Sequence, residues 1–269
     1  MSLMKIAVIP NTGKEGAESL AETIIGEFPE NCFLVKGYKC GEKFDVALVL
    51  GGDGTILRAV KAFGEAPVLG INFGAVGYMT ASEKDGAKEA VKKLLSGSYN
   101  VEERMMLSVT VKRNGKVISE STALNDGVIT RSERILSLSE SFNDKLVYSF
   151  SGDGIIVATP TGSTAYSLSA GGPVAPPDMQ MIITTPVCPH SIHIRPVIAS
   201  GDTVVKVKLS DTEENSGMLN VDGQNITPLT CGDEVIFARS EKKAKLIFLE
   251  EKNFYDILRF KLSGEKGER

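Results

Sequence analysis

The residues best placed to do chemistry form the run Gly51-Gly52-Asp53-Gly54-Thr55, directly after the apolar run Val46–Leu50. The glycines let backbone N–H groups approach an anion closely, and the free N–H groups that begin a following helix favour a phosphate. A carboxylate among phosphates is electrostatically costly unless it takes a proton or binds a metal, so Asp53 points to catalysis. The alternative is a turn aspartate that caps the helix.

Neither of two common phosphate-binding patterns describes this loop. It lacks the lysine of the Walker sequence, and no G-x-G-x-x-G fingerprint occurs between a strand and a helix. The chain is therefore a poor match to a hydride-transfer enzyme.

Three later segments also combine polar residues with turns. Small and hydroxylated residues fill 159–173, after Gly152-Asp153-Gly154, and would suit a planar or sugar ligand or simply a polar loop that enters a helix. Leu124-Asn125-Asp126-Gly127 could bind a base edge or ribose hydroxyls, although it is also a common turn. Asp222-Gly223-Gln224 predicts a hairpin turn.

The first hundred residues alternate short apolar runs with helical periodicity. Strands are expected at 5–9, 46–50 and 67–71, and helices at 17–28, through 56–63 and from 87 to about 97. This pattern predicts an α/β domain over 1–100 with a Rossmann-like parallel sheet. The glycine loop would lie at the carboxyl end of a strand, where ligands of open α/β sheets bind.

After about Val101 the period changes to two, which predicts an all-β sandwich domain over 101–244. Asn114-Gly115 favours a tight hairpin within it. Helical spacing returns at Phe254, Ile257, Leu258 and Leu262, so 245–269 is expected to form a helix that packs on the first domain.

The composition of the chain disfavours several classes of binding partner. The chain has 269 residues and a formal net charge of -4, which disfavours nucleic acid and anionic membranes as partners. Its four cysteines and two histidines show no zinc spacing. We expect packed, reduced thiols in a cytoplasmic protein, and we expect His190 and His193 to pack rather than to catalyse.

In these segments the chain resembles the NAD kinases, which phosphorylate the 2′-hydroxyl of the adenosine ribose of NAD to give NADP. Diacylglycerol-type lipid kinases and phosphofructokinases carry similar glycine loops, whereas the run Thr-Gly-Ser-Thr-Ala-Tyr at 161–166 separates NAD kinases from them. The resemblance covers nearly the whole chain and rests on 51–55, 70–74, Asn125-Asp126, Asp153-Gly154, 161–166, 171–173, 186–196 and 222–224.

The resemblance implies that Asp53 accepts the proton of the ribose 2′-hydroxyl, in a cleft between the domains. It implies ATP or polyphosphate as phosphoryl donor, a divalent cation (Mg²⁺ or Mn²⁺), and a homodimer or homotetramer assembled through the sandwich. The residues it implies for nucleotide binding are Gly51, Gly52, Gly54, Thr55, Arg58, Asn72, Phe73, Asn125, Asp126, Asp153, Thr161, Ser163, Thr164, Ala165, Tyr166, Ser167, Leu168, Ser169, Asp222 and Gln224.

Two positions depart from the family pattern, since Ala75 and Ser151 stand where a basic or imidazole side chain is frequent. Arg58, Arg131, the helix dipole and the metal must then supply more of the positive charge. Two other functions stay open: a kinase for a lipid or a sugar phosphate that shares only the glycine loop, and a dinucleotide sensor without catalysis.

Overall fold

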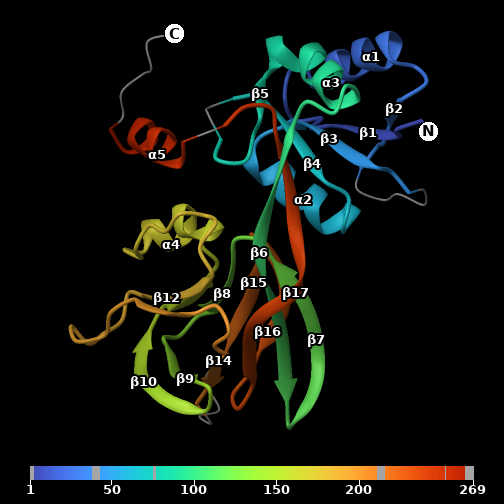
Figure 1. Cartoon of the computed structure of the whole chain (residues 1–269). Helices are drawn as coiled ribbons and strands as arrows, with labels where there is room; N and C mark the ends of the chain where they lie inside the picture. Colours follow the sequence, from blue (N-terminus) through green and yellow to red (C-terminus); the bar gives the residue numbers. More distant parts are fainter. Residues whose placement is uncertain (1–2, 38–42, 75–76, 211–215, 252, 264–269) are drawn as a thin grey trace. The chain divides into compact units, whose positions relative to one another are not determined.

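The computed structural model describes residues 3–37, 43–74, 77–210, 216–251 and 253–263. The chain forms two units, which are described separately. Unit 1 comprises Met1–Glu103 with Ala244–Arg269, and unit 2 comprises Arg104–Lys243. The chain passes from one unit to the other in two long strands, β6 (Asn100–Arg113) and β17 (Glu234–Phe248) (Figure 1).

Unit 1 is built on a parallel sheet with the strand order β2-β1-β3-β4. The end of β17 pairs with the start of β4 through Leu246 and Val68, also in parallel. Apolar runs without alternation form β1, β3 and β4, because both faces of the sheet are covered there. The strands are β1 (Ile6–Pro10), β2 (Cys32–Leu34), β3 (Val46–Gly51), β4 (Val68–Asn72) and the short β5 (Ser82–Glu83).

The strand order reverses between β1 and β3. From β1 the chain crosses to β2 on one side, and β3 then pairs with the other side of β1. Ligands of open α/β sheets bind at the carboxyl ends of strands at such a reversal. The loops that begin at Asn11 and at Gly52 therefore lie at the preferred binding edge of the sheet.

The helices α1, α2 and α3 of unit 1 each bury one face, whereas α5 has no fully buried residue. In α1, Ala17, Ala21 and Ile24 are buried, as their spacing predicts. Gly64, with φ 61°, ends α2 as expected. The helices are α1 (Ala17–Glu27), α2 (Asp53–Phe63), the 3-10 turn Lys84–Gly86, α3 (Ala87–Leu95) and α5 (Phe254–Ser263). The predicted α/β layer with a C-terminal helix is confirmed.

Unit 2 is the predicted β-sandwich. One sheet has the order β13-β12-β11-β8-β15-β16, and the other combines β10-β9-β14-β17 with β6 and β7. Its strands also include β7 (Lys116–Ala123), β8 (Asp126–Arg131), β9 (Leu136–Phe142), β10 (Lys145–Gly152), β11 (Gly154–Ala158), β12 (Met181–Val187), β13 (Val197–Ser200), β14 (Val205–Leu209), β15 (Gly217–Val221) and β16 (Gln224–Leu229).

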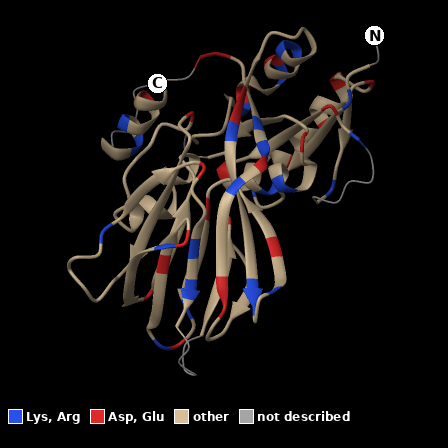
Figure 2. Ribbon diagram, turned by 60° about the horizontal axis from the view of Figure 1, so that its bottom comes forward, with Lys and Arg blue, Asp and Glu red and all other residues tan. Residues whose placement is uncertain are grey.

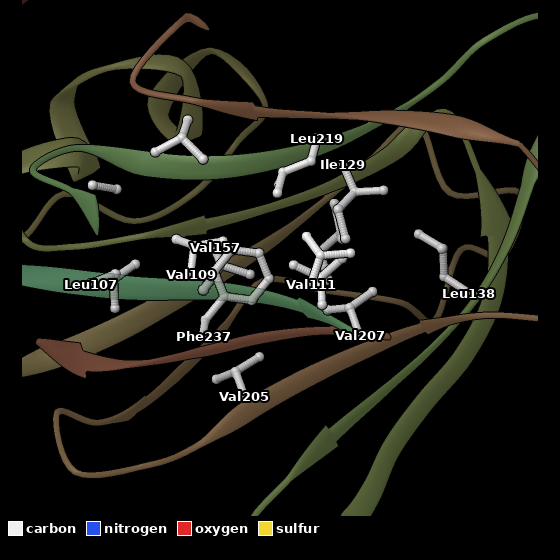
Figure 3. Packing of buried hydrophobic residues seen from close by; sticks show 14 of the residues in the cluster. Leu107, Val109, Val111, Ile129, Leu138, Val157, Val205, Val207, Leu219 and Phe237 are labelled. Atoms are coloured by element: carbon white, nitrogen blue, oxygen red, sulfur yellow. The ribbon is translucent and has the colours of Figure 1, made fainter. Parts of the chain in front are cut away.

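Alternate residues of both sheets form the sandwich core. Phe237 of β17 is fully buried and belongs to the same cluster as Leu107 of β6 and Val157 of β11 (Figure 3). The hairpin turns predicted at Asn114-Gly115 and Asp222-Gly223 are confirmed, since all four residues have positive φ. The run 159–173 contains two short helical segments, Thr161–Thr164 and α4 (Tyr166–Ser169). Neither is long enough to show a helical period of apolar residues in the sequence.

Some expectations about side-chain burial are wrong. His190 and His193 are exposed rather than packed. Cys32 is buried, but Cys188 and Cys231 are exposed thiols, and Cys40 lies outside the described residues. Acidic and basic residues are interspersed along the strands (Figure 2), in keeping with the small net charge. Among the described residues, no helix is long and apolar enough to span a membrane.

One charged group lies in the sandwich core. Glu140 of β9 is fully buried on the face of the strand that also carries Leu136 and Leu138. Within the described part of the chain, neither its carboxylate oxygens nor the buried Thr184 hydroxyl has a partner with hydrogen-bond geometry. Burial raises the pKa of Glu140 to about 7, and the nearby Thr184 hydroxyl offsets part of the shift.

Glu140 should therefore make the protein less stable as pH rises. The folded protein keeps this proton between the ordinary value of 4.5 and about 7, where the unfolded chain has lost it. The free energy of unfolding then falls across that window, by up to about 3 kcal/mol, because one pKa unit corresponds to about 1.4 kcal/mol. Urea unfolding from pH 5 to 8 should show a shallower fall in Glu140→Gln. Equal slopes for the variant and the parent protein would contradict this account.

Candidate active site

The glycine loop occupies the sheet edge where the strand order reverses. Gly51 ends β3, Gly52 precedes α2 in an extended conformation, and a Cβ at Gly51 would lie 2.5 Å from the Thr55 Oγ1. The Asn11 Nδ2 donates a hydrogen bond to this Thr55 oxygen at 2.9 Å. The loops after β1 and β3 are thus joined. The start of α2 is where an anion would be held, and we call it the anion seat.

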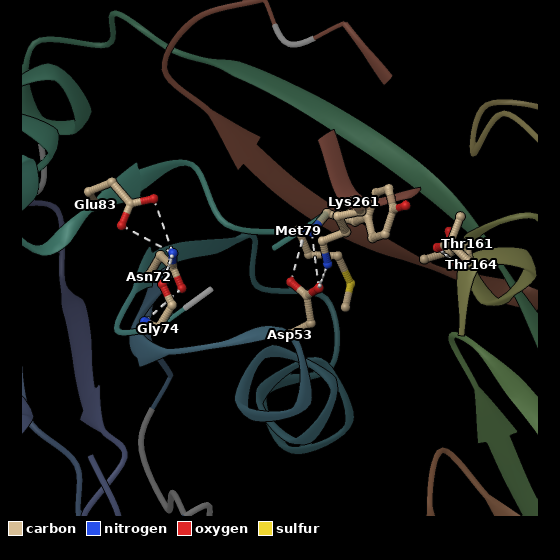
Figure 4. Close-up of polar contacts among 9 residues, drawn as sticks. Asp53, Asn72, Gly74, Met79, Glu83, Thr161, Thr164 and Lys261 are labelled. Carbon is tan, nitrogen blue, oxygen red and sulfur yellow. Dashed lines mark hydrogen bonds and ion pairs between the residues drawn. The ribbon is translucent and has the colours of Figure 1, made fainter. Parts of the chain in front are cut away.

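Asp53 is the first residue of α2, and its side chain is held by another segment. The Tyr78 N–H donates to Oδ2 at 3.0 Å, and the Met79 N–H donates to Oδ1 at 3.1 Å (Figure 4). The side chain keeps 28% of its exposure. The structure contradicts the helix-capping alternative, since Gly52 is the N-cap and no side chain caps α2. The carboxylate is fixed in position and still accessible.

A lysine from the far end of the sequence lies beside this carboxylate. The Lys261 Nζ in α5 is 3.9 Å from the Asp53 Oδ2 and 4.2 Å from the centroid of the Tyr78 ring. The Tyr78 ring also contacts Phe254 of α5, with centroids 6.1 Å apart. Burial and, second, the charge of Asp53 raise the pKa of Tyr78.

Sequence reasoning missed Lys261, although a signal existed. It lies seven positions after Phe254, on the apolar stripe of the predicted helix, where a lysine is out of place. Lys14 was also missed. It follows the Asn11 turn after β1, and its Nζ is 3.5 Å from where a Cβ on Gly74 would lie.

The two predicted contacts at the end of β4, Asn72 and Phe73, help to shape the loop that follows. Asn72 is buried, and its Nδ2 donates to the Gly74 carbonyl and to both carboxylate oxygens of Glu83 (Figure 4). The half-buried Phe73 packs against the core of unit 1. The Asn72 side chain therefore ties the end of β4 to Glu83, and its role as a nucleotide ligand stays a prediction. Ala75 lies outside the described residues, and Arg58 is exposed on α2.

In unit 2, three motifs that are far apart in the sequence converge. The Asp222 carboxylate accepts hydrogen bonds from the backbone N–H groups of Leu124, Asn125 and Asp126, at 2.9, 2.8 and 3.2 Å. The Thr159 N–H donates to the Asn125 carbonyl at 2.8 Å, and a Cβ on Gly162 would overlap the same oxygen. The Asp222 carboxylate thus organises the Asn125-Asp126 turn, and its contact with a nucleotide stays a prediction.

Asp126 is the most perturbed acid of this group. Its residue exposure is only 5%. Burial and, second, the charge of Asp222 raise its pKa to about 7. A carboxyl group that changes charge near neutral pH beside a rigid turn is a candidate for ligand recognition.

In the hydroxylated run 159–173, some side chains bond within the protein and others are accessible. The Ser163 hydroxyl bonds to the backbone of Ala175, and the Ser167 hydroxyl bonds to Thr185. Both serine residues are fully buried, so their hydroxyls stabilise the fold of this run, and their contact with a nucleotide stays a prediction. The Thr161 hydroxyl is buried and has no partner among the described residues. The more accessible predicted contacts are Thr164, Ala165, Tyr166, Leu168 and Ser169.

Arg131, which is expected to supply positive charge, forms an ion pair with Asp153. Its Nε is 2.7 Å from the Asp153 Oδ1, and its backbone N–H bonds to the Asp153 carbonyl. This pair orients the half-exposed Asp153. Ser151 exchanges a hydroxyl hydrogen bond with Ser137 at 3.1 Å, and Gln224 is exposed at the start of β16.

These features define a class of protein. Unit 1 has a fixed carboxylate beside the anion seat, and unit 2 has polar groups suited to a sugar and a base. Such groups are typical of a kinase that phosphorylates a small hydroxyl compound. Residues 34–99 match the family model of the ATP-NAD kinase N-terminal domain, and residues 124–249 match that of the C-terminal domain. The chain belongs to the NAD kinase family.

Curated relatives of the chain are also NAD kinases. The chain is 43% identical over 228 residues to an NAD kinase of Acetivibrio thermocellus, with 83% of this chain and 78% of the relative covered. It is 38% identical over 266 residues to an NAD kinase of Ruminiclostridium cellulolyticum, with 97% and 93% covered.

Solved structures share the fold. Yeast NADH kinase complexed with NADH superposes with a TM-score of 0.87 at 23% identity, over 99% of this chain and 89% of that one. An NAD kinase from Archaeoglobus fulgidus in complex with ATP gives a TM-score of 0.77 at 24% identity, over 97% of this chain and 100% of that one.

The position of Asp53 predicts a strict requirement at Gly77. A Cβ at Gly77 would collide with the Asp53 Oδ1 and lie 3.0 Å from its Cγ. Gly77→Ala must displace the carboxylate from its two N–H donors, so we expect a loss of about 1–3 kcal/mol in the free energy of unfolding. The control is Gly26→Ala in α1, where a Cβ meets nothing within 4 Å. Equal stability of both variants in urea titrations would refute the fixed position of Asp53.

Proposed function

We propose that this chain is an NAD kinase that transfers the γ-phosphoryl group of ATP to the 2′-hydroxyl of the adenosine ribose of NAD. The observation that carries the proposal is the Asp53 carboxylate, held by two backbone N–H groups beside the glycine-lined start of α2. The family match of both halves of the chain supports the choice of substrates.

In this proposal Asp53 is the general base. It orients the 2′-hydroxyl and accepts its proton while the bond from the 2′-oxygen to the γ-phosphorus forms. The bond from that phosphorus to the β-γ bridging oxygen breaks, and ADP leaves. Because phosphoryl transfer needs little covalent chemistry from the protein, positioning and charge neutralisation supply most of the rate.

The anion seat of unit 1 would hold the donor phosphates. The N–H groups of the loop 51–55 and the positive end of the α2 dipole act together on them. An archaeal relative of the same fold is described in complex with ATP, which supports ATP as donor. Polyphosphate stays an alternative donor for the same seat.

The polar groups of unit 2 would bind NAD. Carboxylates such as those of Asp126 and Asp153 accept hydrogen bonds from ribose hydroxyls, and the Asn125 side chain offers both a donor and an acceptor to a base edge. The accessible residues Thr164 and Tyr166 would extend this surface. The structure of yeast NADH kinase with NADH supports a dinucleotide ligand for this fold.

A divalent cation would arrive with the donor. The described residues contain no cluster of three or more His, Cys, Asp or Glu side chains that could hold a metal ion. Mg²⁺ commonly keeps several waters and binds to substrate phosphates with only one or two carboxylates. Bound to the donor in this way, the cation would neutralise the phosphate charge.

The quaternary structure and the location are also proposals. Exposed Ile192 and Ile198 on unit 2 support a homodimer or homotetramer formed through the sandwich. The free thiols of Cys32, Cys188 and Cys231 support a reducing compartment such as the cytoplasm.

Asp53→Asn should lower turnover by about 10²- to 10⁴-fold, the usual effect of removing a general base, while NAD still binds. A coupled assay of NADP formation with ATP and Mg²⁺ measures the first, and calorimetry measures the second. The matched control is Asp144→Asn, an exposed aspartate paired with Lys206. Wild-type turnover in Asp53→Asn would remove this residue from the mechanism.

The same assay separates the other functions. ATP consumption with diacylglycerol or fructose 6-phosphate but not with NAD would favour a lipid or sugar-phosphate kinase. NAD binding without ATP-dependent NADP formation, at any divalent metal tested, would favour a dinucleotide sensor.

NAD binding should depend on pH through Asp126, whose pKa is raised to about 7. If the ionised carboxylate accepts ribose hydroxyls, protonation below pH 7 weakens binding. The dissociation constant of NAD should then rise by up to about tenfold between pH 8 and pH 6, since one pH unit below the pKa costs a factor of ten. Asp126→Asn should bind weakly at both values. A flat profile in the parent protein would exclude the ionised form of Asp126 as a ligand.

A further inference from the structure

The proposed reaction creates a charge problem in unit 1. The transferred phosphoryl group brings negative oxygens beside Asp53, which is itself an acid. The loop 51–55 contains no lysine or arginine. Arg131, expected to contribute positive charge, is engaged with Asp153 in unit 2 at 2.7 Å. A cationic side chain close to Asp53 would add to the N–H groups of the loop and to the divalent cation in neutralising this charge.

Lys261 has the geometry of such a cation. Its Nζ lies 3.9 Å from the Asp53 Oδ2, close enough for electrostatic attraction but beyond hydrogen-bond distance. The ammonium also lies 4.2 Å from the centroid of the Tyr78 ring, a cation–π distance that fixes it without using a carboxylate acceptor. Its side chain keeps 30% of its exposure, so its N–H donors are accessible to a ligand.

Tyr78 contacts both the Asp53 carboxylate and the Lys261 ammonium. Tyr78 donates its backbone N–H to Asp53, and its ring lies against both Lys261 and Phe254 of α5. The C-terminal helix is therefore docked by the residue that holds the carboxylate. This coupling sets the ammonium and the carboxylate at a defined separation.

We propose that Lys261 donates a hydrogen bond to an oxygen of the γ-phosphoryl group while that group moves to the acceptor, an inference that rests on the proposed kinase activity. Lys261 transfers no proton. The hydroxyl proton goes to Asp53, the 2′-oxygen bonds to phosphorus, and ADP leaves with the electrons of the broken bond. The lysine stabilises the negative charge on the phosphoryl oxygens and reduces the repulsion between that charge and the Asp53 carboxylate.

Three variants test the proposal by steady-state kinetics with ATP, Mg²⁺ and NAD. Lys261→Met keeps a long stem on Tyr78 without the charge, and should lower kcat by about 10- to 1000-fold with little change in the KM for NAD. Lys261→Arg keeps the charge and should retain most of the turnover. Arg259→Met removes a positive charge from the same helix, at an exposed residue paired with Asp256, and should behave like the parent protein.

Wild-type kcat in Lys261→Met would overturn the proposal. Equal losses in Lys261→Met and Lys261→Arg would also overturn it, because packing rather than charge would then matter. A double variant separates contact with phosphate from an effect through Asp53. In the Asp53→Asn background, Lys261→Met should lower the residual turnover further. No additional loss would show that the lysine acts only by positioning Asp53.

Binding of inorganic tripolyphosphate keeps the test independent of the acceptor. If the parent protein forms no NADP, the proposed function fails, but calorimetry still measures the affinity for this probe with Mg²⁺ present. Lys261→Met should weaken binding at least tenfold relative to Arg259→Met. Equal affinities in the two variants would overturn the role of Lys261 with phosphate.

Discussion

The arrangement of unit 1 depends on the two hydrogen bonds that hold the Asp53 carboxylate. Hydrogen bonds from backbone N–H groups to a charged acceptor are stronger than neutral ones, and here they join the start of α2 to the segment after β4. That segment must pass close to the end of β3, which leaves no space for a side chain at Gly77. Asp53 thus belongs to the structure of the sheet edge as well as to its chemistry.

Unit 2 also has a carboxylate held by backbone N–H groups, since Asp222 accepts hydrogen bonds from the three consecutive N–H groups of 124–126. Its charge has a second effect, since it adds to burial in raising the pKa of the neighbouring Asp126. Glu140 shows the contrast. It is buried without a well-formed partner, and so it retains a proton instead of organising a turn.

The sequence predicts those features that depend on local pattern. Periodicity indicates β3 and α2, and the positive φ of Asn114-Gly115 follows from its residue types. The glycine loop could be recognised because its strand and helix flank it directly. The burial of Ser163 and Ser167 could not be predicted, since their partners Ala175 and Thr185 meet them only in the folded sandwich. Lys261 lies more than two hundred positions from Asp53, so only the return of α5 brings them together.

The central claim is that Asp53 accepts the proton of the ribose 2′-hydroxyl. A crystal structure of the protein with NAD and a non-hydrolysable ATP analogue tests it most directly. The account predicts the 2′-oxygen of the adenosine ribose at about 2.6–3.2 Å from an Asp53 carboxylate oxygen, within reach for proton transfer. A ribose bound with its 2′-hydroxyl directed at another side chain, and Asp53 without contact to the ligand, would contradict it.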